Sequence, residues 1–298
     1  MTSSTVYLQE LPYSPDSCGL FARIRHLPHA LLLDSSHPHS HAGRYDILTA
    51  APEFSIDFNS YNSDTYEDLV SIFEEISKLH SSFFKGISAP AEELPFCGGI
   101  AGYLGYGLGK PLQHLPAEED PDGQLQAYNW AVIQDHLLQR CTFTALPALP
   151  KSRRRELLEL LREPLPQAMP AFRLEARFES NMSTEQYRTA FQKIQRYILE
   201  GDCYQVNLAQ RFSAPYSGDS WAAYQLLRPL AAAPFAAYLQ VDEQRQLLCL
   251  SPERFLSLHG HTVETRPIKG TRPRHADPET DALAAEELRM SDCAFRRW

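Results

Sequence analysis

Residues 251–271 read SPERFLSLHGHTVETRPIKGT, and this stretch predicts a β-hairpin. The turn signal at Gly260 lies between two runs of strand-favouring residues. Folding the chain at this glycine brings Glu253 opposite residues 266–269. Cross-strand and diagonal neighbours lie within about 5–8 Å of one another, which is inside the reach of two long side chains. The pattern therefore predicts that Glu253 and Lys269 meet at the open end of the hairpin.

An amine beside a carboxylic acid suits a reaction in which Lys269 attacks a substrate while Glu253 protonates the leaving group. The alternative is a surface ion pair, because exposed Lys–Glu pairs are common and individually weak. A proline close to each residue and the Gly270-Thr271 pair after the lysine favour the catalytic interpretation.

The second informative stretch is residues 183–212. Ser183 and Gln186 form a capping-box signature, apolar residues then recur at helical spacing, and Gly201 is a stop signal. After the helix the period changes to two, which predicts a strand over residues 204–208. Its polar face carries two amides that can hold a small polar molecule, since amides both donate and accept hydrogen bonds; ordinary exposed strand residues are the alternative. The two amides are Gln205 and Asn207.

Three motifs in this order resemble the chorismate-utilising enzymes: GDCYQVNLAQRF at 201–212, SPERF at 251–255 and TRPIKGT at 265–271. The segments LPFCGG at 94–99 and GYLGY at 102–106 are similar to the glycine-rich part of the family's first half. The likeness runs from about residue 10 to Ser291. Within the family the chain looks most like the component I branch of aminodeoxychorismate synthase, because anthranilate synthases carry alanine where this chain has Lys269. Isochorismate and salicylate synthases carry a lysine where this chain has Gln205.

The resemblance implies that Lys269 attacks the chorismate ring and that Glu253 is the general acid that expels the C4 hydroxyl. Ammonia then adds at C4 and displaces the lysine. A neighbouring carboxylate favours the charged, non-nucleophilic lysine, so either burial outweighs this effect or Glu253 is protonated when Lys269 attacks. Arg266 fits either substrate binding or a structural surface role. The implied substrate-binding residues are Gln205, Asn207, Arg266, Gly270 and Thr271.

A second set of residues matches positions where some family members hold a tryptophan molecule. The alternative is that they are ordinary core and loop residues. The set comprises Ser35, Gly43, Arg44, Tyr45, Pro234, Phe235 and Ala236.

The order of elements predicts an α+β fold. Helices are expected over Glu67–His80 and Arg153–Leu161, and a buried strand over Tyr128–Leu138. The resemblance sharpens the fold to a layered sandwich of large antiparallel sheets with outer helices, incomplete at the C-terminus. The expected organisation is a component I-like N-terminal region at 1–145, a connecting segment at 146–180, the first part of the chorismate-binding domain at 181–291 and an aberrant tail at 292–298.

Relatives are expected to continue beyond Ser291, into a part that carries the ligands of Mg2+ in this family. The residues after Ser291 read as an unrelated tail, which suggests a frameshifted or prematurely ended reading frame. Magnesium is therefore expected for the full-length family, with its ligands absent from this chain.

The composition excludes several classes of protein. With a net charge of −9, nothing indicates a nucleic-acid-binding face. The six cysteines are scattered without a Cys-x-x-Cys pair, so neither zinc nor a disulfide framework is indicated. No apolar run approaches membrane-spanning length, and the cytosol is the expected location.

Two further motifs have plain explanations. The glycines between Gly98 and Gly109 do not match a dinucleotide or phosphate-loop fingerprint, so turns or close backbone packing are expected. The alternating histidines His37, His39 and His41 could bind a metal, but Pro38 and polar neighbours favour a solvated loop.

Two functions remain open from the sequence. The first is a chorismate-aminating subunit that receives ammonia from a glutamine amidotransferase partner (component II). The second is a non-catalytic remnant that binds tryptophan or the amidotransferase without turnover. Anthranilate synthesis is a third, weaker interpretation.

Overall fold

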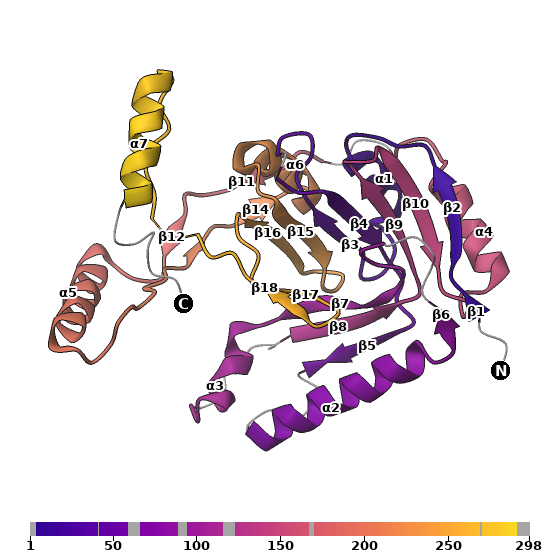
Figure 1. Cartoon of the computed structure of the whole chain (residues 1–298), viewed down its shortest axis with the longest axis horizontal. Helices are drawn as coiled ribbons and strands as arrows, with labels where there is room; N and C mark the ends of the chain where they lie inside the picture. Colours follow the sequence, from indigo (N-terminus) through magenta and orange to yellow (C-terminus); the bar gives the residue numbers. More distant parts are fainter. Residues whose placement is uncertain are drawn as a thin grey trace. The chain divides into compact units, whose positions relative to one another are not determined.

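The central sheet of the computed structural model contains seven strands in the order β16-β15-β3-β4-β9-β10-β2, and each neighbouring pair is antiparallel (Figure 1). The structure describes residues 4–40, 42–58, 66–88, 94–115, 123–166, 170–268 and 270–290. The strands are β2 (Tyr7–Leu11), β3 (Leu31–Asp34), β4 (Tyr45–Thr49), β9 (Trp130–Asp135), β10 (Arg140–Ala145), β15 (Phe235–Gln240) and β16 (Gln246–Ser251).

β9 lies inside this sheet, and all six of its residues are buried. The predicted strand over Tyr128–Leu138 was too long at both ends. Asn129 separates β9 from the preceding strand, which belongs to another sheet. At the other end, the Asp135 carboxylate accepts hydrogen bonds from the backbone N–H groups of Leu137 and Leu138, at 3.0 and 3.1 Å. This side-chain-capped turn replaces strand pairing with a tight connection to β10.

A second, three-stranded antiparallel sheet has the order β5-β8-β7. It consists of β5 (Phe54–Asp57), β8 (Gly123–Tyr128) and β7 (Gly99–Leu104), and Figure 1 shows α2 (Tyr66–Phe83) beside it. The apolar stripe of α2 meets the residues that follow β5 in a small core formed by Phe58, Leu69, Ile72 and Leu108. The helix predicted over Glu67–His80 is therefore confirmed.

Close backbone packing explains one of the glycines in the glycine-rich segment. A Cβ atom on Gly102, in β7, would lie 2.0 Å from the carbonyl oxygen of Gln124, in β8. Only glycine leaves room for this approach, in agreement with the expectation from the sequence.

Short strands and helices complete this part of the chain. β1 (Ser4–Thr5) pairs in parallel with β6 (Ile87–Ser88). The helices are α1 (Cys18–Ile24), the 3-10 turn η2 (Tyr106–Leu108), α3 (Gly109–Leu112), α4 (Lys151–Leu160), α6 (Ser220–Ala231) and α7 (Pro278–Met290). Antiparallel sheets with separate helices make the fold α+β, as predicted.

Residues 166–227 form a compact unit of their own, and residues 1–165 with 228–298 form the other. The smaller unit contains α5 (Thr184–Glu200) and two short antiparallel ladders. The ladders pair β11 (Arg173–Leu174) with β14 (Tyr216–Ser217) and β12 (Glu179–Ser180) with β13 (Phe212–Ser213). α5 buries none of its side chains. The domain boundaries drawn from the sequence remain predictions.

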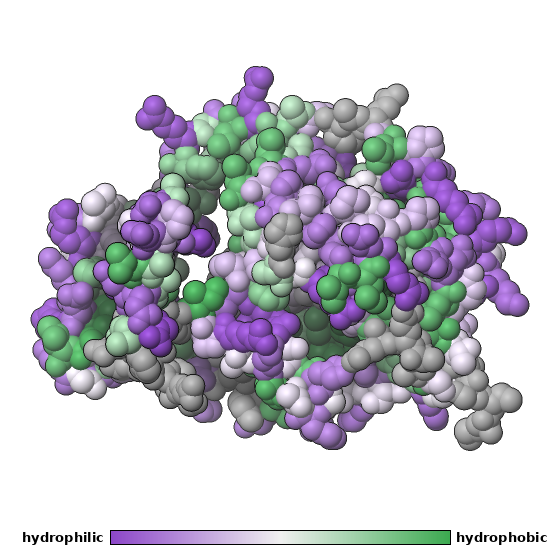
Figure 2. Space-filling view, turned by 45° about the horizontal axis from the view of Figure 1, so that its top comes forward, coloured by the Kyte–Doolittle hydropathy of each residue, from purple (hydrophilic) through white to green (hydrophobic). Residues whose placement is uncertain are grey.

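A hairpin follows β16 and consists of β17 (Ser257–His259) and β18 (Thr262–Glu264). Hydrophobic residues are exposed at several places on the surface (Figure 2), among them Phe255, Leu258 and Val263 of this hairpin region. Within the described residues, no helix combines the length and the apolar character that crossing a bilayer requires.

Candidate functional site

The hairpin that carries Glu253 forms at the predicted turn. Ser257 pairs with Glu264 and His259 with Thr262, and Gly260 adopts a φ of 58°. Beyond the ladder, the Thr265 hydroxyl donates to the carbonyl of Phe255 at 2.8 Å. The Arg254 guanidinium donates to the Glu264 carboxylate. These contacts join the two arms on the side of the hairpin where Glu253 lies.

The backbone of Glu253 is held by its own motif. The Ser251 hydroxyl donates to the carbonyl oxygen of Glu253 at 2.8 Å and accepts from its N–H at 3.3 Å. Glu253 itself is partly exposed, as a group that meets a substrate must be. Lys269 lies outside the described residues. Strand pairing ends at the Ser257–Glu264 pair, so the register does not fix the face on which residues 253 and 269 project, and their meeting stays a prediction.

The neighbours of Lys269 are largely exposed. The Arg266 side chain is 80% exposed and donates to Glu264 at 2.7 Å. Gly270 has a φ of 79°, and it and Thr271 are exposed. Glu264 thus joins two arginines of the motif, and the substrate-binding roles of these residues remain predictions.

The strand predicted over residues 204–208 is wrong. Residues 204–211 have no regular secondary structure, and Gln205 and Asn207 are exposed. No neighbouring strand pairs with the backbone of this segment. The β12–β13 ladder includes only residues from Phe212 onward on this side. An alternating sequence produces a strand only where a neighbour accepts its backbone hydrogen bonds. The substrate-binding roles of these two amides remain predictions.

The residues predicted to hold tryptophan do gather in one place, around the ends of β3, β4 and β15. A Cβ atom on Gly43 would lie 2.4 Å from Cβ of Ser35 and 3.3 Å from the carbonyl oxygen of Pro234. Phe235 begins β15 and pairs with Ser251, the first residue of the Glu253 motif. The structure places these residues close together, and binding of tryptophan there remains a prediction.

Arg44 and Tyr45 lie at the start of β4. The Arg44 guanidinium donates to both oxygens of Asp135, at 2.7–3.1 Å, and lies 4.6 Å from the centre of the Tyr45 ring. Burial raises the pKa of the Asp135 carboxyl, but Arg44 and the backbone N–H groups of Leu137 and Leu138 outweigh it and hold that pKa below its ordinary value.

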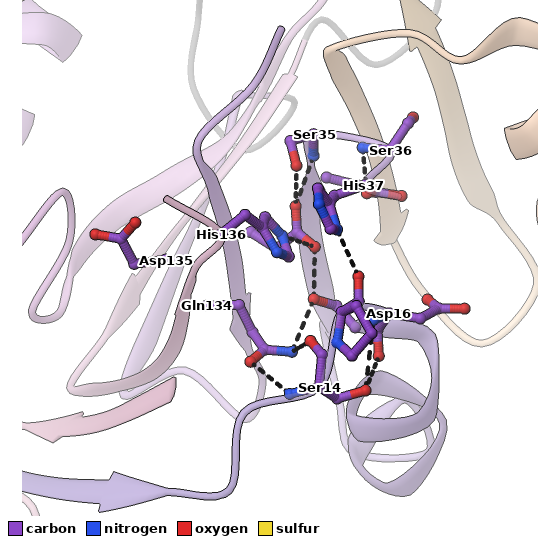
Figure 3. Close-up of polar contacts among 12 residues, drawn as sticks. Ser14, Asp16, Ser35, Ser36, His37, Gln134, Asp135 and His136 are labelled. Carbon is purple, nitrogen blue, oxygen red and sulfur yellow. Dashed lines mark hydrogen bonds and ion pairs between the residues drawn. The ribbon is translucent and has the colours of Figure 1, made fainter. Parts of the chain in front are cut away.

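Beneath Ser35 lies a buried carboxylate that the sequence interpretation did not single out. Both the N–H and the hydroxyl of Ser35 donate to Asp46 Oδ1 at 2.7 Å, and the Ser17 hydroxyl donates to Oδ2 at 2.5 Å (Figure 3). His136 Nε2 lies 2.9 Å from the same Oδ2. Burial alone raises the pKa of Asp46, yet hydrogen bonds and charge from His136, Ser17 and Ser35 outweigh it and lower that pKa.

Two histidines extend this cluster. The rings of His37 and His136 stack with their centres 4.1 Å apart (Figure 3). His136 Nδ1 lies 3.1 Å from the Tyr13 hydroxyl. His37 is partly exposed in a turn at residues 37–39, in line with the loop expected from the sequence, and its ring also packs against the buried His136 ring. His39 is exposed, and His41 lies outside the described residues.

An arginine anchors the same loop from the other side. Arg228, 2% exposed, donates to both oxygens of Asp34 at 2.6 and 3.0 Å and to the His37 carbonyl at 2.6 Å. Burial lowers the pKa of its guanidinium, but Asp34 more than compensates and raises it. The sequence marks the two buried carboxylates only by their neighbours. Asp34 precedes Ser35 and Asp46 follows Tyr45, and both neighbours belong to the set predicted to hold tryptophan.

Among the described residues, no three His, Cys, Asp or Glu side chains are placed to hold a metal ion. The described residues therefore do not fit the magnesium site that the resemblance implies.

Comparison with known proteins identifies the family. The family model described as chorismate binding enzyme matches residues 29–292. The chain belongs to this family. It is 39% identical over 285 residues to aminodeoxychorismate synthase component 1 from Escherichia coli, covering 91% of this chain and 61% of that protein. It is 36% identical over 297 residues to the Klebsiella aerogenes protein of the same name, covering 94% and 63%.

A solved structure supports the fold. Anthranilate synthase component I from Streptococcus pneumoniae superposes with a TM-score of 0.65 at 24% sequence identity, covering 85% of this chain and 58% of that one. The chain spans 61–63% of the length of the two aminodeoxychorismate synthase component 1 proteins named above.

Proposed function

We propose that this chain is the chorismate-binding part of an aminodeoxychorismate synthase component I. The observation that carries the proposal is family membership together with the motif at 251–271, which has a lysine at position 269 and a Ser251 hydroxyl that holds the Glu253 backbone. In this reaction chorismate and ammonia give 4-amino-4-deoxychorismate, a precursor in folate and 4-aminobenzoate biosynthesis. We place the reaction in the cytosol, as the sequence leads us to expect.

The mechanism uses the two groups in turn. The uncharged amine of Lys269 forms a bond to the chorismate ring, and the C4 hydroxyl leaves as water after it takes a proton from Glu253. Ammonia then bonds to C4 and the lysine amine leaves, which regenerates the enzyme. Glu253 must be protonated before the first step. The lysine nitrogen keeps both of its protons in the adduct and leaves as the free amine, and the one proton that the added ammonia loses returns to Glu253.

The covalent step is tested by mass spectrometry. The protein is incubated with chorismate and magnesium without ammonia, and the intact mass and the peptide that contains residue 269 are measured. We expect an adduct on Lys269 that Lys269→Ala abolishes and that disappears when ammonium chloride is added. Full retention of amination in Lys269→Ala would contradict the covalent role of the lysine. Arg272→Ala is a matched control in the same segment, since Arg272 has no proposed role in the chemistry.

The nature of the product separates the proposal from anthranilate synthesis. We expect 4-amino-4-deoxychorismate from chorismate and ammonium chloride, and anthranilate as the product would refute the assignment. With glutamine in place of ammonia, we expect turnover only after a glutamine amidotransferase subunit is added, because this family branch receives its ammonia from such a partner.

A second candidate is a non-catalytic remnant that binds tryptophan or the amidotransferase. The exposed apolar residues on α5 and around the Glu253 motif, including Phe191, Ile198 and Phe255, favour it, because an active site needs covered walls to exclude water. Titration with tryptophan separates the two candidates: binding without any product from chorismate supports the remnant.

A further inference from the structure

A groove between β2 and α4 is lined by positive charge in a chain whose net charge is −9. Figure 1 shows α4 beside β2 at one edge of the seven-stranded sheet. The groove has a volume of about 240 Å3 and is open to solvent, which leaves room for a small anion. We call it the basic groove; its polar lining includes Tyr7, Lys151, Arg154, Arg155, Glu159 and Arg162.

The charges of the basic groove do not cancel. Four cations face one carboxylate, and that carboxylate, Glu159, lies 3.8 Å from Arg155. Lys151, Arg154 and Arg162 take part in none of the ion pairs that the described residues form. The next arginine of the helix, Arg153, pairs with Glu156 at 3.1 Å and does not line the groove.

One of the three cations is already held in place. The Arg154 guanidinium lies 3.7 Å from the centre of the Tyr7 ring, a cation–π contact that orients its donor groups. Tyr7 is itself fixed, since its hydroxyl donates to Gln9 at 2.7 Å. A preoriented guanidinium loses less conformational entropy when it binds an anion.

The basic groove is separate from the Glu253 motif. β2 and β16 are the two opposite edges of the seven-stranded sheet, and residue 251 ends β16. Six strand spacings separate these edges, about 29 Å at ~4.8 Å per spacing. The cations of the groove therefore do not contribute to the proposed chorismate chemistry.

We propose that the basic groove binds a small phosphate-bearing anion. Lys151 and Arg154 lie one helical turn apart, and Arg162 follows the end of α4. This arrangement suits the several oxygens of a tetrahedral phosphate better than the two of a planar carboxylate. The guanidinium fork matches phosphate geometry, and the lysine adds a point charge. A local cluster of cations offsets the repulsion that the net negative charge of the chain exerts on an anion.

The proposal is tested by isothermal titration of the whole chain with inorganic pyrophosphate at low ionic strength. We expect saturable binding that weakens as salt is added. Arg154→Ala and Lys151→Ala should each weaken it about tenfold, or about 1.4 kcal/mol, since each removes a charge-assisted hydrogen bond. Arg154→Lys keeps the charge but loses the planar fork over Tyr7, and should give an intermediate affinity.

Arg153→Ala is the matched control, because Arg153 lies on the same helix outside the groove, and it should bind pyrophosphate like the unaltered chain. Circular dichroism confirms that each variant is folded. Absence of binding, or equal losses in Arg153→Ala and Arg154→Ala, would overturn the proposal. Tighter binding of citrate than of pyrophosphate would overturn the assignment of phosphate.

Discussion

At the scale of single residues, Gly43 shows how little room the predicted amino-acid site leaves. Replacing it with alanine places a methyl group 2.4 Å from Cβ of Ser35. We expect Gly43→Ala to lower the free energy of unfolding by about 1–3 kcal/mol, the usual cost of overpacking. Urea denaturation measures this. Gly109→Ala is the control, because a methyl group there meets nothing within 4 Å. Equal stability of the two variants would show that Gly43 is not constrained.

Ionisation of Asp46 makes the free energy of unfolding depend on pH. Its pKa is lowered in the folded chain, so its ionised form stabilises the fold at pH values above the ordinary aspartate pKa of 3.8. This stabilisation is lost as the pH falls from there through the lower, folded pKa. We expect the urea midpoint to decline over that window and to decline less in Asp46→Asn.

The same substitution should destabilise the chain at neutral pH by about 1.5–3 kcal/mol, because it weakens the hydrogen bonds that Ser17 and Ser35 donate to a charged, buried acceptor. Asp242→Asn is the control, because Asp242 also has a lowered pKa through Arg245 but is exposed. If the urea midpoints of Asp46→Asn and Asp242→Asn change with pH in the same way, the buried cluster around Asp46 is not the source of the pH dependence.

At the scale of elements, α5 begins and ends as its sequence predicts. Ser183 Oγ accepts from the Gln186 N–H at 3.2 Å, the Gln186 side chain accepts from the Ser183 N–H at 2.7 Å, and Gly201 closes the helix with a φ of 84°. α5 has no buried side chain, so its stability depends more on these caps than that of a packed helix does.

Ser183→Ala should therefore reduce the helicity of residues 184–200 and cost about 1 kcal/mol, the usual value of an N-cap. Circular dichroism and amide exchange of this segment measure the loss. Ser77→Ala, at an exposed position in the interior of α2, is the control. Unchanged exchange rates at the start of α5 would refute the role of the capping box.

At the scale of the whole molecule, the two compact units differ in packing. β9 is buried along its full length, whereas α5 buries no side chain. Few buried apolar contacts mean low local stability. We expect hydrogen exchange to be slow in β9 and many times faster in α5, although both are hydrogen-bonded elements. Equal protection in the two would mean that something covers α5 in solution.

The sequence by itself determined α5 with its caps, the β17–β18 turn, α2 and the family motifs. These features rest on helical periodicity and turn residues that lie within a few positions of one another. The same local reasoning was wrong for residues 204–208, where an alternating pattern had no strand to pair with.

Only the tertiary structure decided the rest. Arg228 and Asp34 are 194 positions apart, and Ser17 and Asp46 are 29 apart, yet both pairs lie in one buried polar cluster. The basic groove likewise joins Tyr7 to a helix that starts at Lys151. No periodicity records such contacts, because they depend on how the sheet orders its strands and not on the spacing of residues along the chain.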